Sequence, residues 1–246
     1  MYLTEKIEQY VYAMDVRVGF EECTPDLRMK PADLLKKVIS AAGFHYDLRG
    51  VSHKMMYDHG QIFVLSRISL IINALPSYGD KITVTTWEGE PQSVFAVRSY
   101  EVLSEKGDLL ASALSNWVVI DPLTRSIKRP TAFDLCQYRP VAKIPDCLPC
   151  EKIKPDAECK IFDSRPVRPS DTDANGHFHS AFYAYFVTDA LPEEYQTRVP
   201  KDMSFNFIKE AKAGDVLDLC VKQEEDTFTV TAVNGDHNCF TARFTY

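Results

Sequence analysis

The residues best suited to chemistry lie in the second half of the chain, where Asp173, Asn175 and His177 are spaced two apart. In an extended or irregular loop, residues two apart point the same way, so these three side chains could converge on one spot. An apolar stretch with helical spacing follows, and a helix N-terminus would add backbone N–H groups and a dipole that favours negative charge. A carboxylate, hydrogen-bonding side chains and N–H donors are what acyl transfer to water requires.

The same loop also fits a purely structural interpretation. Asp and Asn are common in turns and at helix caps, because their side chains bond to nearby backbone groups. Asp173-Ala174-Asn175-Gly176 alone would make a good turn, and a histidine beside a turn is more often a surface residue than a catalyst. The loop by itself leaves catalysis and helix capping equally open.

The elements that would position this loop recur in both halves. Residues 31–43 have apolar side chains at helical spacing, with Pro31 suited to the first turn and Gly43 to the C-terminal cap. Residues 177–191 have a second apolar stripe of the same kind. Segments rich in β-branched and aromatic residues predict strands at 81–87, 94–103, 112–120, 227–233 and 238–246.

The two halves also share smaller features in the same order. Residues 69–80 resemble residues 204–215, and the turn at 106–108 matches the hairpin signal at 234–236. Chance agreement of a few Gly-Asp pairs is the alternative. A long apolar helix wrapped by a curved antiparallel sheet would bury both surfaces in each half, so the predicted class is α+β.

We place the two predicted domains at residues 1–130 and 161–246. The stretch between them, 131–160, is rich in proline, which breaks both helices and strand ladders. It is also longer than the usual connection inside a compact domain. We therefore interpret it as the crossing between the domains.

These features together resemble the acyl-acyl-carrier-protein thioesterases of plants and bacteria, which are tandem, or double, hotdog proteins. Their second half carries an Asp-x-Asn-x-His motif before an aromatic-rich helix, as residues 173–177 do here. Downstream they carry a short strand ending in a catalytic Glu, and residues 205–211 match that strand with Glu210 in this place. Residues 95–102 and 117–121 resemble first-half strands of the family. The resemblance runs from about Tyr10 to the end of the chain.

The resemblance implies that Asp173, Asn175, His177 and Glu210 form the catalytic site. We expect Asp173 and Glu210 to activate or carry out the attack on the thioester carbonyl, directly or through water. Asn175 and His177 would position the carboxylate or the water, and backbone N–H groups near residues 176–178 would hold the oxyanion. Many plant members have a cysteine directly after the Glu, whereas this chain has Ala211, so a Cys–His mechanism cannot operate there.

The first half is expected to keep the domain's shape without the catalytic residues, and in the resembled family it shapes the acyl pocket. Aligning the motif-bearing segments places three first-half residues opposite Asp173, Asn175 and His177, namely Asp26, Arg28 and Lys30. Aligning the Gly-Asp pairs places Leu75 opposite Glu210.

The expected reaction is hydrolysis of a fatty-acyl thioester of acyl carrier protein to free acid and carrier thiol, with no cofactor and no metal. A rim of basic residues would steer an acidic carrier protein, or would be an ordinary solvated edge. Its members are Arg165, Arg168, Arg198, Lys201, Lys209 and Lys212. Acyl-CoA as substrate, a hotdog dehydratase and a non-catalytic acyl-binding protein are the alternatives, and a dehydratase would need no Glu at position 210.

Composition narrows the class of protein further. The net charge of -7 argues against a non-specific nucleic-acid binder, and no apolar run approaches the ~20 residues of a membrane span. The first residues lack a signal or transit peptide, so we expect a cytoplasmic protein, with a homodimer left open. Seven cysteines are too few and irregular for a disulfide scaffold and are expected as reduced thiols. The C-x-x-C at Cys147 and Cys150 is read as coincidence, and Cys220 and Cys239 as core thiols.

Overall fold

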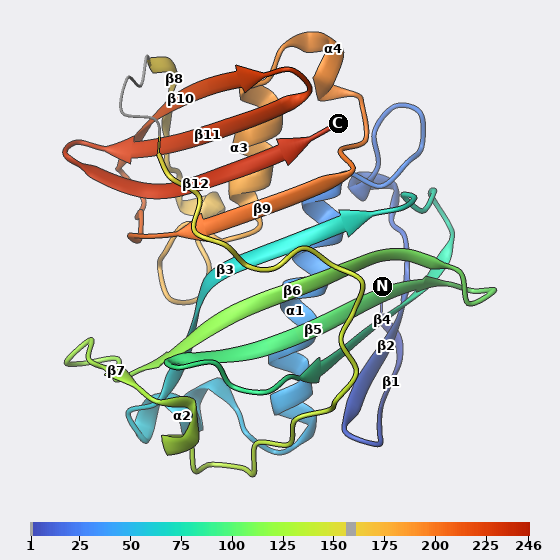
Figure 1. Cartoon of the computed structure of the whole chain (residues 1–246), viewed down its shortest axis with the longest axis vertical. Helices are drawn as coiled ribbons and strands as arrows, with labels where there is room; N and C mark the ends of the chain where they lie inside the picture. The colour runs from blue at the N-terminus through green and yellow to red at the C-terminus, as the bar shows by residue number, and fades with distance from the viewer. Residues whose placement is uncertain (1, 156–160) are drawn as a thin grey trace. The chain divides into compact units, whose positions relative to one another are not determined.

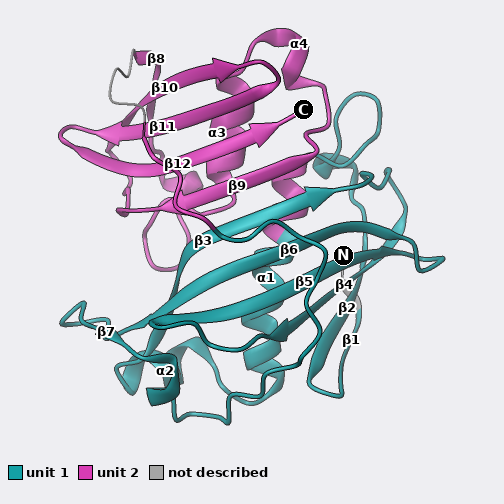
Figure 2. Cartoon of the chain, viewed as in Figure 1, with its two compact units in different colours: residues 1–30, 37–150 teal, residues 31–36, 151–246 magenta. Residues whose placement is uncertain are grey.

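The computed structural model describes residues 2–155 and 161–246, which form two compact units. The first unit contains residues 1–30 and 37–150, and the second contains residues 31–36 and 151–246. Figure 2 distinguishes the two units by colour.

The first unit is built on an antiparallel sheet in which neighbouring strands follow the order β1-β2-β4-β5-β6-β3, with β7 paired to β6 (Figure 1). Its strands are β1 (Tyr2–Glu8), β2 (Val11–Arg17), β3 (Ile62–Ile72), β4 (Lys81–Glu88), β5 (Phe95–Ser104), β6 (Leu109–Ile120) and β7 (Ile127–Lys128). The alternating burial of β2 and β4 shows why they pair: one face of each is buried in the core, as the period of two requires.

The long helix α1 (Pro31–Leu48) packs its last turns against this sheet. Tyr46 donates a hydrogen bond to Glu88 of β4 (2.7 Å), and His45 bonds to Arg98 of β5 (2.9 Å). The predicted helix end at Gly43 is wrong, because α1 continues for another turn to bury His45 and Tyr46. A glycine with positive φ does follow the real end, at Gly50 (φ 80°).

Shorter elements complete the first unit: the 3₁₀ turns η1 (Phe20–Glu22) and η2 (Pro130–Ala132) and the helix α2 (His53–Asp58). Residues 133–150 form no helix or strand and lie across the sheet. They are fixed by hydrogen bonds from strand side chains to their backbone, including Trp87 to Lys143 (2.7 Å) and Arg67 to Cys150 (3.2 Å). These hydrogen bonds satisfy carbonyl groups of the segment and hold it against the sheet.

The second unit repeats the plan with a sheet in the order β9-β12-β11-β10-β8. Its elements are β8 (Ile161–Pro166), η3 (Pro169–Asp171), α3 (Phe182–Ala190), α4 (Glu193–Gln196), β9 (Asp202–Phe207), β10 (Val216–Glu224), β11 (Thr227–Asn234) and β12 (His237–Thr245). Its core is strongly aromatic, with Phe205, Phe228, Phe240 and Phe244 all fully buried.

The tandem hotdog prediction is confirmed, since each unit is an antiparallel sheet accompanied by a helix (Figure 1). The five strands predicted from β-branched and aromatic residues all occur, within a few residues of the expected ends. The predicted second helix is wrong at its beginning: α3 starts at Phe182, five residues after His177. Among the described residues, no helix is long and apolar enough to cross a membrane.

Among the described residues, Cys220 differs from the prediction for the cysteines. Cys220 of β10 takes part in a disulfide, so its assignment as a reduced core thiol is wrong. Cys136, Cys147, Cys150 and Cys239 are free thiols. Burial raises the pKa of Cys147 to about 12 and that of Cys150 to about 11, so these two thiols are protonated and unreactive at neutral pH.

Candidate active site

The residues of the Asp-x-Asn-x-His motif form a tight hairpin between η3 and α3. Asp173 and His177 are joined by a backbone hydrogen bond (N to O, 2.8 Å), and Gly176 N donates to Asp173 O (2.9 Å). Gly176 has a φ of 74°, a left-handed conformation that glycine adopts without steric cost. Thr172 and Phe178 form a bridge at the base of the hairpin. The Asp-Ala-Asn-Gly sequence therefore makes a turn, as its residue types predict.

The Asp173 carboxylate holds this turn together. Its Oδ1 accepts hydrogen bonds from the backbone N of Asn175 (2.8 Å) and of His177 (3.4 Å). An Asp that bonds the N–H two residues later is a common way to fix a turn. Asp173 is therefore a positioning group for the backbone that carries Asn175 and His177, and its half-buried carboxylate stays at the base of the loop.

The backbone N–H groups expected to hold an oxyanion are already engaged. Gly176 and His177 donate to Asp173, and Phe178 N donates to Ala211 O (2.8 Å). Because α3 starts only at Phe182, these groups are not at a helix N-terminus. The prediction of an oxyanion hole from residues 176–178 is wrong for this reason.

Glu210 lies against His177, with 3.3 Å between Glu210 Oε2 and His177 Nε2. Both side chains are about one quarter exposed, at 28% for Glu210 and 25% for His177. A carboxylate and an imidazole at this distance are groups that can take up or release a proton in acid–base chemistry. The structure thus brings these two residues together across 33 positions of sequence.

The loop that carries Glu210 is fixed at both ends. Before it, Ile208 N and Lys209 N both donate to Cys239 O on β12 (2.8 and 3.1 Å). After it, Ala211 accepts from Phe178, and Lys212 forms a bridge with His177. This anchoring of the backbone on both sides places the Glu210 side chain beside the hairpin.

Asn175 is at the tip of the turn, and its side chain is exposed. Its amide makes no hydrogen bond to the other residues that the structure describes. The structure therefore joins Asp173, His177 and Glu210 into one connected group, and leaves the Asn175 amide able to meet a ligand.

A second imidazole, His179, lies two residues beyond His177 in the chain. Its Nδ1 accepts a hydrogen bond from Ala181 N (3.2 Å). Burial lowers the pKa of His179, the nearby Asp173 carboxylate opposes this shift, and Lys36 adds to it. His179 is consequently neutral at pH 7. The continued two-residue spacing from Asp173 through His179 is the signal that could have included it.

Aromatic side chains make the wall behind the hairpin. The ring of Phe178 is 4.4 Å from that of Tyr183 and 4.7 Å from that of Phe186, measured between centroids. Ala211, which follows Glu210, is fully buried in this wall. The Glu210–His177 pair thus lies at the boundary between an apolar surface and solvent.

The first unit contains the same hairpin with different side chains. Thr24 N bonds Arg28 O (2.8 Å) and Leu27 N bonds Thr24 O (2.9 Å), with Leu27 at a φ of 63°. These bonds superimpose Thr24 on Asp173 and Arg28 on His177. The predicted register, with Asp26 opposite Asp173 and Lys30 opposite His177, is wrong by two residues.

The Glu210 loop also has a counterpart, and here the predicted alignment is confirmed. Met29 N donates to Pro76 O as Phe178 N donates to Ala211 O, so Leu75 occupies the Glu210 position. The first-unit hairpin carries an Arg28–Asp26 ion pair in place of the histidine–carboxylate pair. The first unit therefore has the backbone of the site without an acid–base group.

Comparison with protein families matches residues 9–134 to the "Acyl-ACP thioesterase N-terminal domain" and residues 154–241 to the "Acyl-ACP thioesterase C-terminal domain". Oleoyl-acyl carrier protein thioesterase 2, chloroplastic, of Arabidopsis thaliana is 23% identical over 229 residues, which cover 86% of this chain and 62% of that protein. The palmitoyl-acyl carrier protein thioesterase of Gossypium hirsutum is 25% identical over 187 residues, covering 72% of this chain and 45% of that protein. This chain thus spans less than two thirds of the length of these plant relatives.

Solved structures with the same fold include an acyl-ACP thioesterase from Bacteroides thetaiotaomicron VPI-5482, with a TM-score of 0.83 and 21% identity. That alignment covers 97% of this chain and 99% of the other. The 12:0-ACP thioesterase from Umbellularia californica has a TM-score of 0.80 and 16% identity over 98% of both chains. At these identities the structures support the fold of the chain over its whole length.

Proposed function

This chain belongs to the acyl-ACP thioesterase family, and from that premise we propose that it hydrolyses fatty-acyl thioesters of acyl carrier protein. The products are a free fatty acid and the carrier's thiol. The observation that carries the proposal is the 3.3 Å contact between His177 and Glu210 beside an apolar wall. This arrangement offers a proton acceptor at a surface where an acyl chain can bind.

In the proposed mechanism, Glu210 is the general base. It takes a proton from a water molecule, whose oxygen attacks the thioester carbonyl carbon. The tetrahedral oxyanion collapses, the C–S bond breaks, and the proton passes to the departing sulfur. His177 holds the Glu210 carboxylate in position through its Nε2, which in this role carries the hydrogen.

Asn175 is the proposed donor to the oxyanion. The backbone N–H groups of the hairpin are engaged, whereas the Asn175 amide is exposed at its tip. An amide donor directed at the developing negative charge contributes to catalysis because it is already in place before reaction. Asp173 fixes the turn that presents this amide and His177. Its negative charge strengthens the hydrogen bonds that it accepts from Asn175 N and His177 N.

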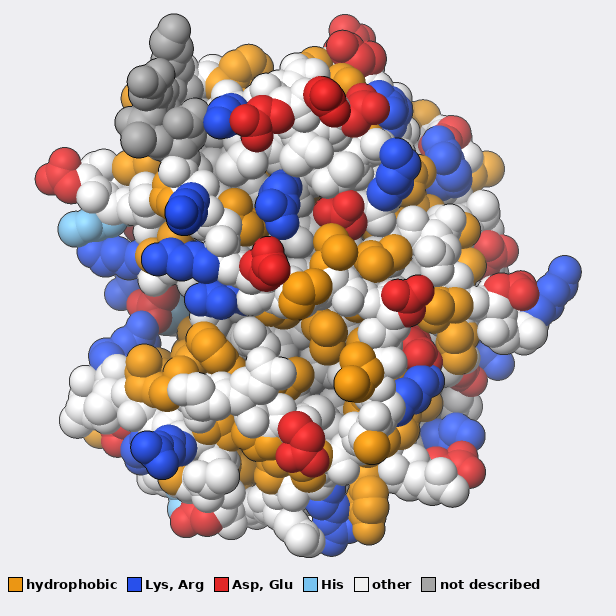
Figure 3. All heavy atoms as spheres, viewed as in Figure 1, with side chains coloured by type: hydrophobic (Ala, Val, Ile, Leu, Met, Phe, Trp, Pro, Cys, Tyr) orange, Lys and Arg blue, Asp and Glu red, His pale blue; other side chains and the backbone are white. Residues whose placement is uncertain are grey.

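The proposed carrier-protein partner is consistent with local charge. Lys209, Lys212 and Arg168 are exposed near the site and have no acidic partner among the described residues. Arg165, in contrast, is paired with Asp163 and Asp189. Figure 3 shows Lys and Arg side chains gathered on one flank of the visible face and mixed charge over the rest. Basic groups of this kind raise the association rate of an acidic protein.

A thiol-release assay tests the proposal. The protein is incubated with panels of acyl-ACP and acyl-CoA of matched chain length, and the released thiol is titrated for the wild type and Glu210→Gln. We expect faster release from acyl-ACP, and release that depends on Glu210. Preference for acyl-CoA would reassign the carrier, and no release from either panel would favour a non-catalytic acyl-binding protein.

Other features remain proposals of the same kind. The first unit is proposed to shape the acyl pocket, because it keeps the hairpin backbone while Leu75 replaces the catalytic carboxylate. The cytoplasmic location expected from the first residues stays a prediction, and the plant relatives are named as chloroplastic. Whether the chain forms a homodimer also stays a prediction, which a measurement of its molecular mass in solution would test.

A further inference from the structure

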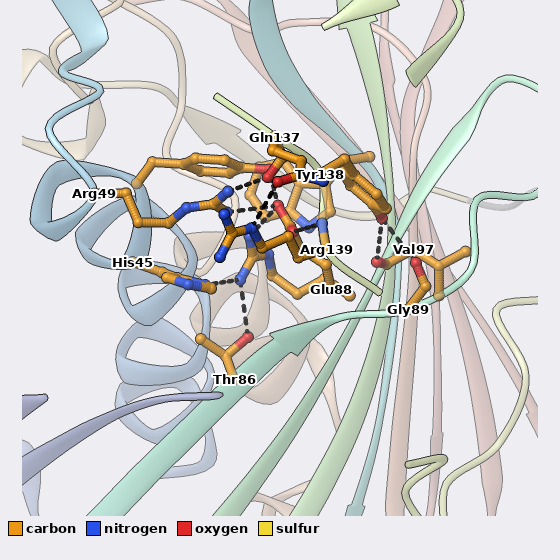
Figure 4. Close-up of polar contacts among 12 residues, drawn as sticks. His45, Arg49, Thr86, Glu88, Gly89, Val97, Gln137, Tyr138 and Arg139 are labelled. Atoms are coloured by element: carbon orange, nitrogen blue, oxygen red, sulfur yellow. Dashed lines mark hydrogen bonds and ion pairs between the residues drawn. The ribbon is translucent and has the colours of Figure 1, made fainter. Parts of the chain in front are cut away.

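A second group of polar side chains surrounds a cavity of about 270 Å³ inside the first unit. Tyr10, His45, Arg49, Glu88 and Arg139 form most of its lining. Figure 4 shows Arg49, Glu88 and Arg139 close together, with His45 on the helix below them. None of these residues belongs to the hydrolytic group in the second unit.

The acidic group of this cavity is Glu88, whose two carboxylate oxygens both accept hydrogen bonds from other parts of the first unit. It is buried, with 1% of its side chain exposed. Its Oε1 accepts hydrogen bonds from Tyr46 Oη (2.7 Å) and Arg49 Nη1 (3.0 Å), and its Oε2 accepts from Arg139 N (2.7 Å). Glu88 therefore neutralises one guanidinium and has little capacity for another.

Arg98 is a second buried cation beside the same carboxylate. Its Nη1 donates to His45 Nδ1 (2.9 Å) and Thr86 Oγ1 (3.3 Å), while its Nη2 has no hydrogen-bond partner within residues 2–155 and 161–246. Its nearest carboxylate oxygen is Glu88 Oε1, at 3.9 Å from Nη2. Because a guanidinium can only donate, His45 Nδ1 accepts, and the imidazole is neutral.

Arg139 adds a third cation at the mouth of the cavity. Its guanidinium lies 4.7 Å from the centre of the Tyr10 ring, and its Nε donates to Gln137 (3.1 Å). Its two terminal nitrogens meet no acceptor among the described residues. Arg49 and Arg98 therefore share the charge of the buried Glu88, which leaves positive charge in excess where burial makes it costly, and the exposed Arg139 adds to that excess.

We propose that this cavity binds the carboxylate of a small organic acid between Arg49 and Arg139, with its short apolar part against Tyr10 and Ile7. The terminal nitrogens of Arg49 already donate to Glu88 and to Gln137 O, so Arg49 contributes its charge, while the two terminal nitrogens of Arg139 match a carboxylate in two parallel hydrogen bonds. One negative charge then reduces the excess of positive charge. A metal cation does not fit, because the single carboxylate is already engaged. The partly apolar lining favours an organic acid over inorganic phosphate.

Calorimetric titration tests this site, with hexanoate as the probe and hexanamide and inorganic phosphate for comparison. The buffer contains no other carboxylate. We expect saturable hexanoate binding that Arg139→Gln weakens at least ~10-fold, since a charge-assisted pair is lost. Arg139 is exposed, so this variant is expected to fold. Arg198→Gln is the matched control, because Arg198 is an exposed arginine stacked on Tyr195 at 4.6 Å in the other unit.

A second control separates this site from the hydrolytic one, where a fatty acid would bind as product. His177→Ala should leave hexanoate binding unchanged if the cavity is the binding site. Loss of binding in His177→Ala and not in Arg139→Gln would overturn the proposal, whether or not the chain is a hydrolase. The absence of saturable binding, or equal binding of hexanamide or phosphate, would also overturn it.

Discussion

The two hairpins, residues 24–28 in the first unit and 173–177 in the second, have the same backbone hydrogen bonds and different side chains. Thr24 Oγ1 bonds Arg28 O (2.9 Å), whereas Asp173 Oδ1 accepts from Asn175 N and His177 N. Either a hydroxyl or a carboxylate can therefore hold the turn. The same backbone turn thus forms with Thr24 in place of Asp173, so the carboxylate of Asp173 is the feature that distinguishes the second hairpin at this position.

The largest expected effect is at Glu210, where the equivalent loop of the first unit has Leu75. Glu210→Gln should lower the turnover number by about 1,000-fold, because a positioned acid–base group typically contributes 10²–10⁴-fold. The equivalent change in the first unit, Leu75→Ala, should alter chain-length preference or stability without abolishing turnover. Thiol release measures both variants. Retention of more than a tenth of the activity in Glu210→Gln would remove Glu210 from the mechanism.

Two variants of Asp173 separate its role in holding the turn from a role in the reaction. Asp173→Ala should lower the hydrolysis rate by at least ~100-fold, since it disturbs the positioned acid–base group. Loss of the two turn hydrogen bonds should cost only about 1 kcal/mol of unfolding free energy. Asp173→Asn retains an oxygen that can accept the two N–H bonds, and should restore the stability but not the rate. If Asp173→Asn is as active as wild type, Asp173 has only the structural role that Thr24 has.

The next effect compares the buried histidines of the two units. Burial, with Arg98 and Arg49 adding to it, lowers the pKa of His45 to about 2, so folded His45 stays neutral while unfolded His45 is protonated below about pH 6.5. The unfolded state then binds more protons, and stability falls as the pH drops through that value. Between pH 7 and pH 5 this costs about 2 kcal/mol. His45→Gln should lose that much less than wild type in urea titrations at the two pH values.

His179 in the second unit has a pKa shifted in the same direction, but it is less buried and lies near Asp173, which opposes the shift. His179→Gln should therefore change the pH dependence of stability by less than His45→Gln does. A change in the pH dependence of stability that is equal or larger for His179→Gln would contradict this ranking of the two histidines.

The smallest expected effect is at Thr24, whose hydroxyl holds the hairpin turn of the first unit. Thr24→Ala should lower the unfolding free energy by about 1 kcal/mol and leave the hydrolysis rate within a few-fold of wild type. Thermal unfolding and the thiol assay measure the two quantities on the same sample. A large loss of rate would show that the first hairpin takes part in function.

Much of this architecture could be predicted from sequence, because strand composition and turn residues act locally. The strands around Trp87, Tyr100 and Phe240 were identified by their β-branched and aromatic residues. The end of α1 was missed because burial of His45 and Tyr46 outweighs the helix-breaking tendency of Gly43. The strands β1, β2, β3, β8 and β10 were not predicted, and in β1 the reason is that most of the strand is exposed and polar.

The site was predicted in its members but not in its details. His177 and Glu210 came from family resemblance, and no local pattern places residues 33 positions apart at 3.3 Å. The register between the two hairpins was wrong because the alignment of the motif-bearing segments placed Asp26 opposite Asp173, whereas the backbone bonds identify Thr24. The charged cavity of the first unit was missed, since Arg49, Glu88 and Arg139 lie on separate elements.

Leu27 stands where the second hairpin has Gly176, and it keeps the left-handed conformation at a φ of 63°. A branched side chain in this region is strained by about 1 kcal/mol or more. For protein engineering, Leu27 is accordingly a place to gain heat resistance, because Leu27→Gly would relieve this backbone strain in a hairpin that contains neither Glu210 nor His177.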